Sequence, residues 1–326
     1  MTDHQKNFAL IGAAGFIAPR HMQAIRDTGN NLVAALDKSD SVGIIDSYFP
    51  DSAFFTEFER FDRHVEKLRR ENGDHVDYVS ICSPNYLHDA HIRFALRVGA
   101  DAICEKPLVV NPWNMNPLTD LEREFGRRIC VILQLRLHPA IIALREQIDA
   151  ERRDSKYDID LTYITSRGRW YYQSWKGDVE KSGGIVMNIG VHFFDMLIWI
   201  FGRPEFSNLH VLEPGRAAGY LELERARVRW FLSLDRNDLP VAPQPGKAAT
   251  YRSITFDGEE IEFSGGFTDL HTQSYQKILG GEHFGIADAR PAIDVVYGIR
   301  TSTPVGLRGE YHPFLGPRSA RITRSA

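Results

Sequence analysis

The sequence predicts an α/β protein with two domains, the first built on a parallel sheet and the second an α+β domain built on an antiparallel sheet. Three observations support this prediction. Short apolar runs alternate with helical patterns over the first third of the chain, a glycine-rich turn follows the first run, and later strand-like runs follow one another without intervening helices. A chain of 326 residues is long enough for two domains of roughly 100–200 residues each.

The first domain is expected to hold parallel strands joined by crossover helices, because its apolar runs are separated by stretches of helical period. The expected strands span residues 8–11, 31–36, 76–82, 101–104 and 128–135, and the expected helices span 19–27, 58–72 and 88–98. We place the domain boundary at 137/138, since Pro139 is suited to open a helix that runs to about Arg152.

In the second domain, residues 138–326, the expected strands follow one another without helices between them. The expected strands span 159–167, 207–212, 218–234 and 251–263, and the expected helices span 268–279 and 291–302. Asp257-Gly258 predicts a hairpin turn because both residues tolerate positive φ. The proline-rich run 240–247 is expected to be a loop.

Composition excludes several classes of function. The net charge of −4 gives no general attraction to nucleic acid or to anionic membranes. Three cysteines without paired spacing fit a reducing compartment, and no Cys or His spacing indicates a metal. The polar N-terminus lacks a signal core, and the apolar run 184–201 contains polar residues, so a buried helix explains it better than a membrane span. We therefore expect a cytoplasmic protein.

A cofactor site is predicted where the first strand meets the glycine-rich turn. Gly12, Gly15, Phe16 and Ile17 lie there, and small residues let a backbone approach a pyrophosphate beside a helix N-terminus. The alternative is a plain tight turn. Asp37 ends the second strand 22 residues after Gly15 and is suited to bind an adenosine ribose, which favours NAD over NADP. Its alternative role is to cap the turn that follows.

Three further motifs occur in a fixed order. Ser83-Pro84-Asn85 precedes His88, Glu105-Lys106-Pro107 follows the next strand, and Gly190-Val191-His192 precedes Asp195. Together they resemble the Gfo/Idh/MocA oxidoreductase family over nearly the whole chain. The resemblance implies an N-terminal Rossmann domain, a C-terminal large open antiparallel sheet, a nicotinamide in the cleft between them, and assembly as a homodimer or homotetramer. It also implies cofactor contacts from the residues that carry these motifs and from one later glutamine: Ser83, Asn85, His88, Glu105, Lys106 and Gln134.

The chemistry of a dehydrogenase agrees with these residue types. Oxidising a secondary alcohol needs hydride transfer to the nicotinamide and removal of the hydroxyl proton. His192 is suited to be the general base, and Lys106 to orient and polarise the substrate oxygen, although the two roles could be reversed. Asn188 lies four residues before His192, where many family members have aspartate, and we expect its amide to hold a sugar hydroxyl.

The segment 166–178 is rich in arginine and aromatic residues. Arg169 and Lys176 are suited to a carboxylate or diphosphate, and Tyr172 to a sugar, although packed aromatics joining two strands would give the same pattern. This segment and the runs 35–43 and 134–139 resemble the branch of the family that oxidises the 3-hydroxyl of UDP-N-acetylglucosaminuronate in bacterial O-antigen synthesis. That branch implies a UDP-sugar substrate, tightly held NAD and recycling of NADH by 2-oxoglutarate.

Other functions fit parts of the pattern. A non-catalytic NAD-sensing repressor partner would not need both Lys106 and His192. A glycosidase that uses NAD transiently would release no NADH. A sugar or inositol dehydrogenase with freely exchanging NAD would fit the catalytic motifs, but the cationic segment argues against a neutral substrate.

Overall fold

The structure is a computed structural model that describes residues 5–70, 75–240, 250–260 and 269–316. The chain divides into two compact units, one formed within residues 1–137 and 268–290 and the other within 138–267 and 291–326. From the sequence, the segment 268–290 is predicted to belong to the second domain. It lies in the first unit instead, because the helix it contains packs on the first crossover helix.

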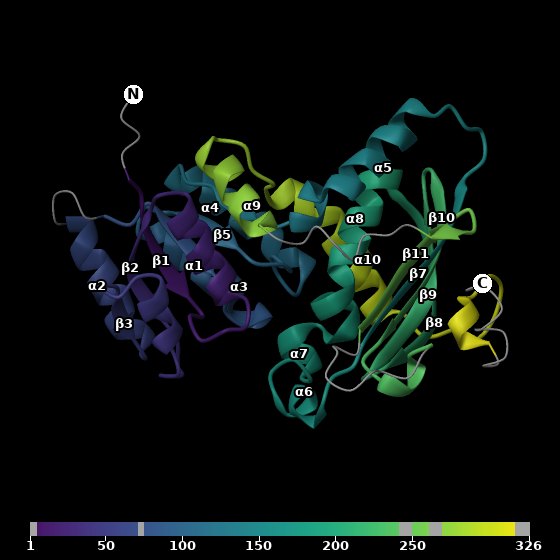
Figure 1. The fold of residues 1–326 in the computed structure, drawn as a ribbon, viewed down its shortest axis with the longest axis horizontal. Helices are drawn as coiled ribbons and strands as arrows, with labels where there is room; N and C mark the ends of the chain where they lie inside the picture. The colour runs from purple at the N-terminus through teal and green to yellow at the C-terminus, as the bar shows by residue number, and fades with distance from the viewer. Residues whose placement is uncertain (1–4, 71–74, 241–249, 261–268, 317–326) are drawn as a thin grey trace. The chain divides into compact units, whose positions relative to one another are not determined.

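The first unit contains a six-stranded parallel sheet with the strand order β3-β2-β1-β4-β5-β6 (Figure 1). Its strands are β1 (Asn7–Ile11), β2 (Asn31–Leu36), β3 (Ala53–Phe55), β4 (Tyr78–Ile81), β5 (Asp101–Cys104) and β6 (Ile129–Val131). This topology confirms the predicted parallel sheet. The three-residue β3 was missed because it is too short to show an alternating pattern, and the predicted run 128–135 is a short strand followed by the 3-10 turn η4 (Gln134–Leu137).

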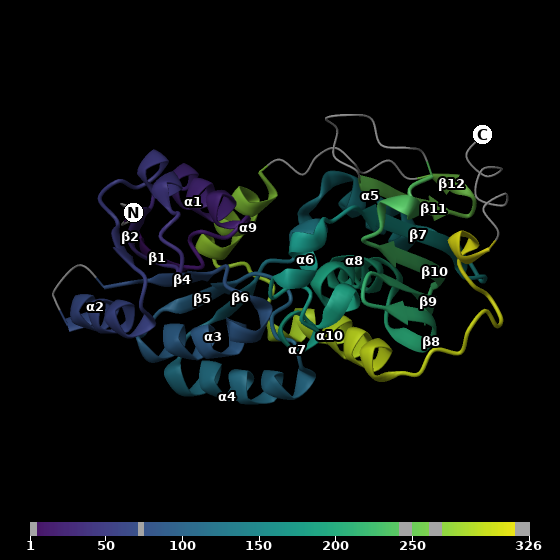
Figure 2. The ribbon, with the colours of Figure 1, turned by 90° about the horizontal axis from the view of Figure 1, so that it is seen from below.

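Helices cover both faces of this sheet, as Figure 2 shows. The helices are α1 (Ala18–Asp27), α2 (Phe58–Arg70), α3 (His88–Arg97), α4 (Met115–Phe125) and α9 (Leu270–Leu279). Helices α1 and α9 pack together on one face, and α3 and α4 lie on the other. An aromatic cluster joins α2 to α3, with the ring centroids of Phe58 and Phe94 5.3 Å apart. The strands between these layers are buried on both sides, which explains their continuous apolar sequences.

The second unit contains a six-stranded sheet with the order β12-β11-β7-β10-β9-β8. Its strands are β7 (Tyr157–Thr165), β8 (Pro204–Glu213), β9 (Arg216–Leu223), β10 (Ala226–Ser233), β11 (Thr250–Phe256) and β12 (Glu259–Glu260). The predicted antiparallel sheet is mixed, because β7 and β10 pair in parallel while its other strand pairs are antiparallel. The chain leaves β7 through helices, returns as the meander β8-β9-β10, and so reaches β7 running in the same direction.

Turns divide two of the predicted strands. The run 218–234 covers most of β9 and all of β10, which form an antiparallel hairpin. Asp257 and Gly258 have φ values of 48° and 91°, so the predicted Asp-Gly turn is confirmed and separates β11 from β12. The predicted loop 240–247 lies almost wholly outside the described residues, as does the end of the predicted strand 251–263.

One face of the second sheet is covered by α5 (Pro139–Ala150) and α8 (Val191–Phe201), and α10 (Ile286–Thr301) continues from the first unit into this one. Pro139 opens α5, as predicted. Phe194 of α8 packs edge-on against Trp230 of β10, and both side chains are fully buried. The helical stretch Val179–Phe201 is long and apolar enough to cross a membrane, but 67% of its most apolar window is buried within the protein. Core packing therefore accounts for its composition.

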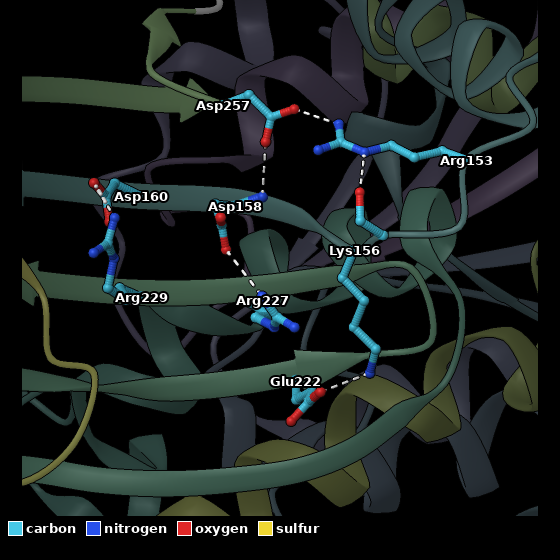
Figure 3. A network of polar contacts seen from close by, with 9 residues as sticks. Arg153, Lys156, Asp158, Asp160, Glu222, Arg227, Arg229 and Asp257 are labelled. Atoms are coloured by element: carbon cyan, nitrogen blue, oxygen red, sulfur yellow. Dashed lines mark hydrogen bonds and ion pairs between the residues drawn. The ribbon is translucent and has the colours of Figure 1, made fainter.

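The opposite face of this sheet carries ion pairs at one end (Figure 3). Arg229 of β10 binds Asp160 of the parallel neighbour β7 at 2.6 Å, and Lys156 binds Glu222 of β9 at 2.7 Å. The other end is covered by a C-terminal turn, η7 (Pro313–Leu315), whose Phe314 packs on Phe231. The chain thus covers part of this face itself and leaves the rest charged.

Gly219 of β9 makes room for the core tryptophan. A Cβ at this position would lie 2.4 Å from the carbonyl oxygen of Asn208 and 2.6 Å from Cζ2 of Trp230. We expect Gly219→Ala to lower the free energy of unfolding by about 1–3 kcal/mol through overpacking. Gly298, exposed in α10 with open space around it, is the control. Gly298→Ala should raise stability by about 0.5–1 kcal/mol. Urea unfolding measures both, and an unchanged Gly219→Ala midpoint would contradict the packing.

Candidate active site

The glycine-rich turn lies directly against the loop that follows β4. Gly12 has φ 94°, and a Cβ there would lie 2.6 Å from the backbone carbon of Cys82 and 2.7 Å from the backbone nitrogen of Ser83. Glycine is therefore required at position 12 for two reasons, backbone conformation and space. Gly15 donates its N–H to the carbonyl oxygen of Gly12 at 3.0 Å, which closes the turn.

Helix α1 presents an N-terminus that no side chain caps. Ile17 is its N-cap residue and makes no capping hydrogen bond, and a proline occupies the first turn. Uncapped amide groups and the positive end of the helix dipole suit a phosphate group. Phe16, next to this end, is 92% exposed, so its ring is free to cover a ligand lying on the turn.

Asp37 contacts the glycine-rich turn from the end of β2. Its Oδ2 accepts a hydrogen bond from Ala14 N at 2.9 Å, and its Oδ1 accepts one from Ser39 N at 2.9 Å. Asp37 therefore caps the turn that follows β2, which is the alternative role that the sequence leaves open. The same carboxylate also lies beside the turn where a dinucleotide ribose is expected.

Two residues predicted to contact a cofactor, His88 and Glu105, make buried contacts within the protein. His88 is fully buried, with Nδ1 2.7 Å from the carbonyl oxygen of Pro107 and Nε2 2.9 Å from that of Ser83. Burial lowers the pKa of His88, while its two carbonyl partners favour the charged form. His88 therefore lies between the Ser83 loop and the Lys106–Pro107 segment, and its neutral ring donates to one of the two carbonyl oxygens. Ser83 is also buried and its hydroxyl contacts His91 Nδ1 at 2.8 Å.

Glu105, the second of these residues, lies in a buried network. Its Oε1 is 2.9 Å from Nε2 of His21 in α1 and 2.9 Å from Nε2 of His271 in α9. Burial alone would raise the pKa of Glu105, but hydrogen bonds from the two histidines outweigh burial and hold the pKa well below its usual range. The carboxylate is therefore ionised, and it links α1 and α9 to the end of β5.

The protons of this network can be assigned from its geometry. Burial lowers the pKa of His21, so its ring is neutral, and Nε2–H donates to Glu105. His21 Nδ1 must then accept a hydrogen bond from the Tyr275 hydroxyl at 2.8 Å. The tyrosine oxygen in turn accepts one from the Ser80 hydroxyl at 2.6 Å. A directed chain of hydrogen bonds thus runs from β4 to the end of β5.

His21, Glu105 and His271 are also residue types that bind metals, and their ligand atoms lie within 4.8 Å of one another. The sequence could not indicate this group because its members are far apart along the chain. Both histidine Nε2 atoms lie at hydrogen-bonding distance from a single carboxylate oxygen, so the contacts of this group are explained without a metal.

Lys106 follows Glu105 at the carboxyl edge of the sheet and is half-buried. The buried Asn85 and the half-buried Gln134 lie after β4 and β6 at the same edge. Gln134 Oε1 is buried, and no described residue donates a hydrogen bond to it. A ligand amide would satisfy this acceptor. With the Gly12 turn and the uncapped α1, this edge of the sheet fits a nicotinamide dinucleotide.

The second unit places Asn188 and His192 on one continuous helical stretch. Asn188 lies in a π-helical turn, η5 (Val186–Gly190), and His192 is the second residue of α8. Asn188 Nδ2 donates to the Tyr171 hydroxyl at 3.0 Å, and both Asn188 and His192 are half-buried. The expected helix is confirmed, but the π turn was not predicted, since propensity does not encode it. Such turns are frequent at functional sites.

The arginine- and aromatic-rich segment forms α6 (Arg169–Gln173), a tight turn and α7 (Val179–Ser182). Arg169 is exposed and makes no ion pair with any described residue. Tyr172 is 47% exposed and packs edge-on against Tyr171. Lys176 is half-buried against Trp175, 4.4 Å from the ring centroid. Tyr171 is buried, as expected for packed aromatics that join two strands, whereas Trp170 and Tyr172 are exposed, as expected for rings that contact a ligand.

Comparison with known proteins agrees with this geometry. Residues 6–133 match the oxidoreductase family with an NAD-binding Rossmann fold, and residues 155–235 match the C-terminal α/β domain of that family. The WlbA (WbpB) dehydrogenase of Thermus thermophilus, solved with NAD and alpha-ketoglutarate, is 51% identical over 95% of this chain and 100% of its own, with a TM-score of 0.89. The chain belongs to the Gfo/Idh/MocA oxidoreductase family. Its first unit is the NAD-binding Rossmann domain.

A second structure of the same dehydrogenase and one curated relative show how far the likeness extends within the family. The same Thermus thermophilus dehydrogenase was solved with NAD and UDP-GlcNAcA, with a TM-score of 0.89, 50% identity, and coverage of 95% of this chain and 100% of that one. The D-glucoside 3-dehydrogenase of Escherichia coli is 28% identical over 41% of this chain and 38% of its own length. The first curated relatives are thus matched over less than two thirds of their length, whereas the Thermus thermophilus structure is matched over all of it.

The close approach at Gly12 gives a first prediction for the site. Gly12→Ala should lower NAD affinity at least tenfold, because the turn must move away from Cys82 to admit a methyl group. Gly29→Ala is the matched control, since Gly29 also has positive φ (75°) but has open space around it. It should cost about 1 kcal/mol of stability and leave NAD affinity unchanged. Tryptophan-quench or calorimetric titration with NAD measures the affinity, and equal affinities for the two variants would contradict the packing.

The buried histidines make stability depend on pH. Burial lowers the pKa of His91 from 6.5 to about 4, so between these values the unfolded chain binds a proton that the folded protein does not. Stability should therefore fall as pH falls, with His91 contributing about 2 kcal/mol between pH 7 and pH 5. Urea unfolding at both pH values should show a smaller loss for His91→Gln than for the wild type. Identical losses would show that His91 titrates normally.

Proposed function

We propose that this protein oxidises the 3-hydroxyl of UDP-N-acetylglucosaminuronate to the 3-keto sugar, with NAD as the oxidant. The observation that supports this most is the 50% identity to the Thermus thermophilus WlbA dehydrogenase solved with NAD and UDP-GlcNAcA, a match that covers that chain completely. Relatives of this similarity commonly share a substrate class, whereas the fold alone would not define one.

The proposed chemistry uses residues of both units. NAD, when bound, accepts the hydride from the sugar carbon. His192 removes the hydroxyl proton, and Lys106 orients and polarises the same oxygen, although the two roles are reversed if the lysine is the stronger base. Asn188 carries no negative charge, so it cannot raise the basicity of His192 as an aspartate would. Its amide already donates to Tyr171, and its carbonyl oxygen is suited to accept from a sugar hydroxyl.

We further propose that 2-oxoglutarate regenerates NAD in the same site. Its keto carbon would take the hydride and its oxygen a proton, giving 2-hydroxyglutarate. The Thermus thermophilus relative was solved with NAD and alpha-ketoglutarate, which supports binding of this keto acid by close relatives. NAD would then remain tightly held, without exchange with solution between turnovers.

The proposed setting is the cytoplasm, in the synthesis of a diacetamido-uronic acid for the O-antigen of lipopolysaccharide. The second unit would bind the substrate and form a homodimer or homotetramer through its sheet. The 3-keto product is suited to transamination at that carbon.

The second candidate is another NAD-dependent sugar or inositol dehydrogenase of the same family. The match to D-glucoside 3-dehydrogenase supports oxidation of a sugar that carries no nucleotide. A substrate screen separates the two candidates.

The decisive assay mixes the purified protein with UDP-N-acetylglucosaminuronate and 2-oxoglutarate. Mass spectrometry should show the nucleotide sugar two hydrogens lighter and an equal amount of 2-hydroxyglutarate. Parallel reactions contain UDP-N-acetylglucosamine, glucose or inositol in place of the uronate. Turnover of inositol or glucose without any change of the uronate would overturn the proposed function.

The proposed catalytic pair is tested by Lys106→Ala and His192→Asn. Each should lower kcat by at least 100-fold while NAD stays bound, because each change removes proton handling while the Gly12 turn and the N-terminus of α1 still bind the dinucleotide. Lys277→Ala and His283→Asn are the exposed controls and should retain wild-type rates. A catalytic variant with the wild-type rate would remove that residue from the mechanism.

A further inference from the structure

A buried carboxylate lies at the cofactor edge of the first sheet. Glu105 follows β5, and its backbone N–H donates to the carbonyl oxygen of Ile81, the last residue of β4, at 3.0 Å. Glu105 is therefore held where the carboxyl ends of these two parallel strands meet, and it is 6% exposed. Dinucleotides bind outside the carboxyl ends of the strands in open α/β sheets. The carboxylate thus lies in the part of the unit where the cofactor binds.

The contacts of this carboxylate are made by groups that need no positive charge. Oε1 lies 2.9 Å from Nε2 of His21 and 2.9 Å from Nε2 of His271. A neutral imidazole donates through one of its nitrogens, so both contacts are possible with uncharged rings. The Tyr275 and Ser80 hydroxyls, which extend the network beyond His21, are also uncharged. Dipoles rather than a counter-ion therefore replace the lost solvation of Glu105.

The field of the carboxylate reaches the glycine-rich turn. Burial raises the pKa of the Cys82 thiol, and the negative charge of Glu105 raises it further. Cys82 in turn lies directly against the glycine-rich turn, since a Cβ on Gly12 would lie 2.6 Å from its backbone carbon. Charges interact more strongly in a buried environment than in water, and salt screens them less there. A ligand on this turn would therefore feel the charge.

The two states of the cofactor differ in charge. The nicotinamide ring is positively charged when oxidised and neutral when reduced, because the hydride brings two electrons. A nearby negative charge stabilises the oxidised ring, whereas the ammonium of Lys106 would repel it. Lys106 directly follows Glu105, so their Cα atoms are about 3.8 Å apart. Glu105 is thus placed to offset the repulsion between Lys106 and the oxidised ring.

We propose that the buried charge of Glu105, held by His21 and His271, favours binding of oxidised NAD over NADH. This inference rests on NAD binding by the Rossmann domain and not on the identity of the sugar. Stabilising the oxidised form lowers the reduction potential of the bound cofactor, so bound NADH becomes a stronger hydride donor. Such a donor favours return of the hydride to a keto acid, which is the recycling step of the proposed function.

The test compares the affinities for the two states of the cofactor. The full-length protein, freed of bound cofactor by dialysis, is titrated by calorimetry with NAD and with NADH at pH 8.5, well above the ordinary histidine pKa. Glu105→Gln removes the charge and keeps the size, and its amide oxygen can still accept from both histidines. The ratio of the Kd for NAD to the Kd for NADH should rise at least fivefold. A tenfold rise would raise the potential of the bound cofactor by about 30 mV.

Three control variants separate the charge from a structural role. Glu105→Asp keeps the charge, and Tyr275→Phe removes a hydrogen bond to His21 without changing any charge. Asp101→Asn removes a buried carboxylate from the opposite end of β5, where it pairs with Arg128. Each control should leave the ratio within twofold of the wild-type value, even where both affinities fall. A purely structural role of Glu105 would weaken NAD and NADH together and leave the ratio unchanged.

An unchanged ratio in folded Glu105→Gln would overturn the inference. If thermal unfolding shows that this variant does not fold, His271→Lys decides, because it places an ammonium beside the intact carboxylate. It should also raise the ratio at least fivefold, and an unchanged ratio there would equally count against the charge. A protein that shows the expected ratios but does not oxidise UDP-N-acetylglucosaminuronate would overturn the proposed function and leave this inference standing.

Discussion

The first unit depends on one buried charge. The Glu105 carboxylate is 6% exposed, and an ionised carboxylate in such surroundings is costly unless hydrogen bonds replace its solvation. His21 and His271 supply those bonds, and each belongs to a different helix. The carboxylate therefore fixes α1 and α9 relative to the end of β5. Removing either histidine would leave the charge under-solvated, so the three residues are interdependent.

This constraint determines where two functional features lie. Helix α1 begins at the glycine-rich turn, and Lys106 follows Glu105 directly, so both are positioned from the same buried group. His88 adds a second link by joining the carbonyl oxygens of Ser83 and Pro107. His88 and Glu105 thus hold the backbone on both sides of Lys106 in place.

In the second unit, aromatic core packing rather than a buried charge fixes the helix that carries His192. Phe194 and Trp230 fix α8 on the sheet, while the π turn at Asn188 changes the helical register just before His192. In the adjoining α6–α7 turn, Lys176 lies against the ring of Trp175, with Nζ 4.4 Å from the ring centroid.

The sequence alone determined the class of fold, the parallel sheet of the first unit and the family, because these depend on hydrophobic periodicity and on local motifs of a few residues. It also indicated Gly12, Asp37, Lys106 and His192, whose neighbours along the chain reveal them. Tertiary structure decided the rest. The parallel pairing of β7 with β10, the return of α9 to the first unit and the His21–Glu105–His271 network join residues that are distant in sequence. Local patterns carry no information about such contacts. The inward orientation of His88 also followed from that packing.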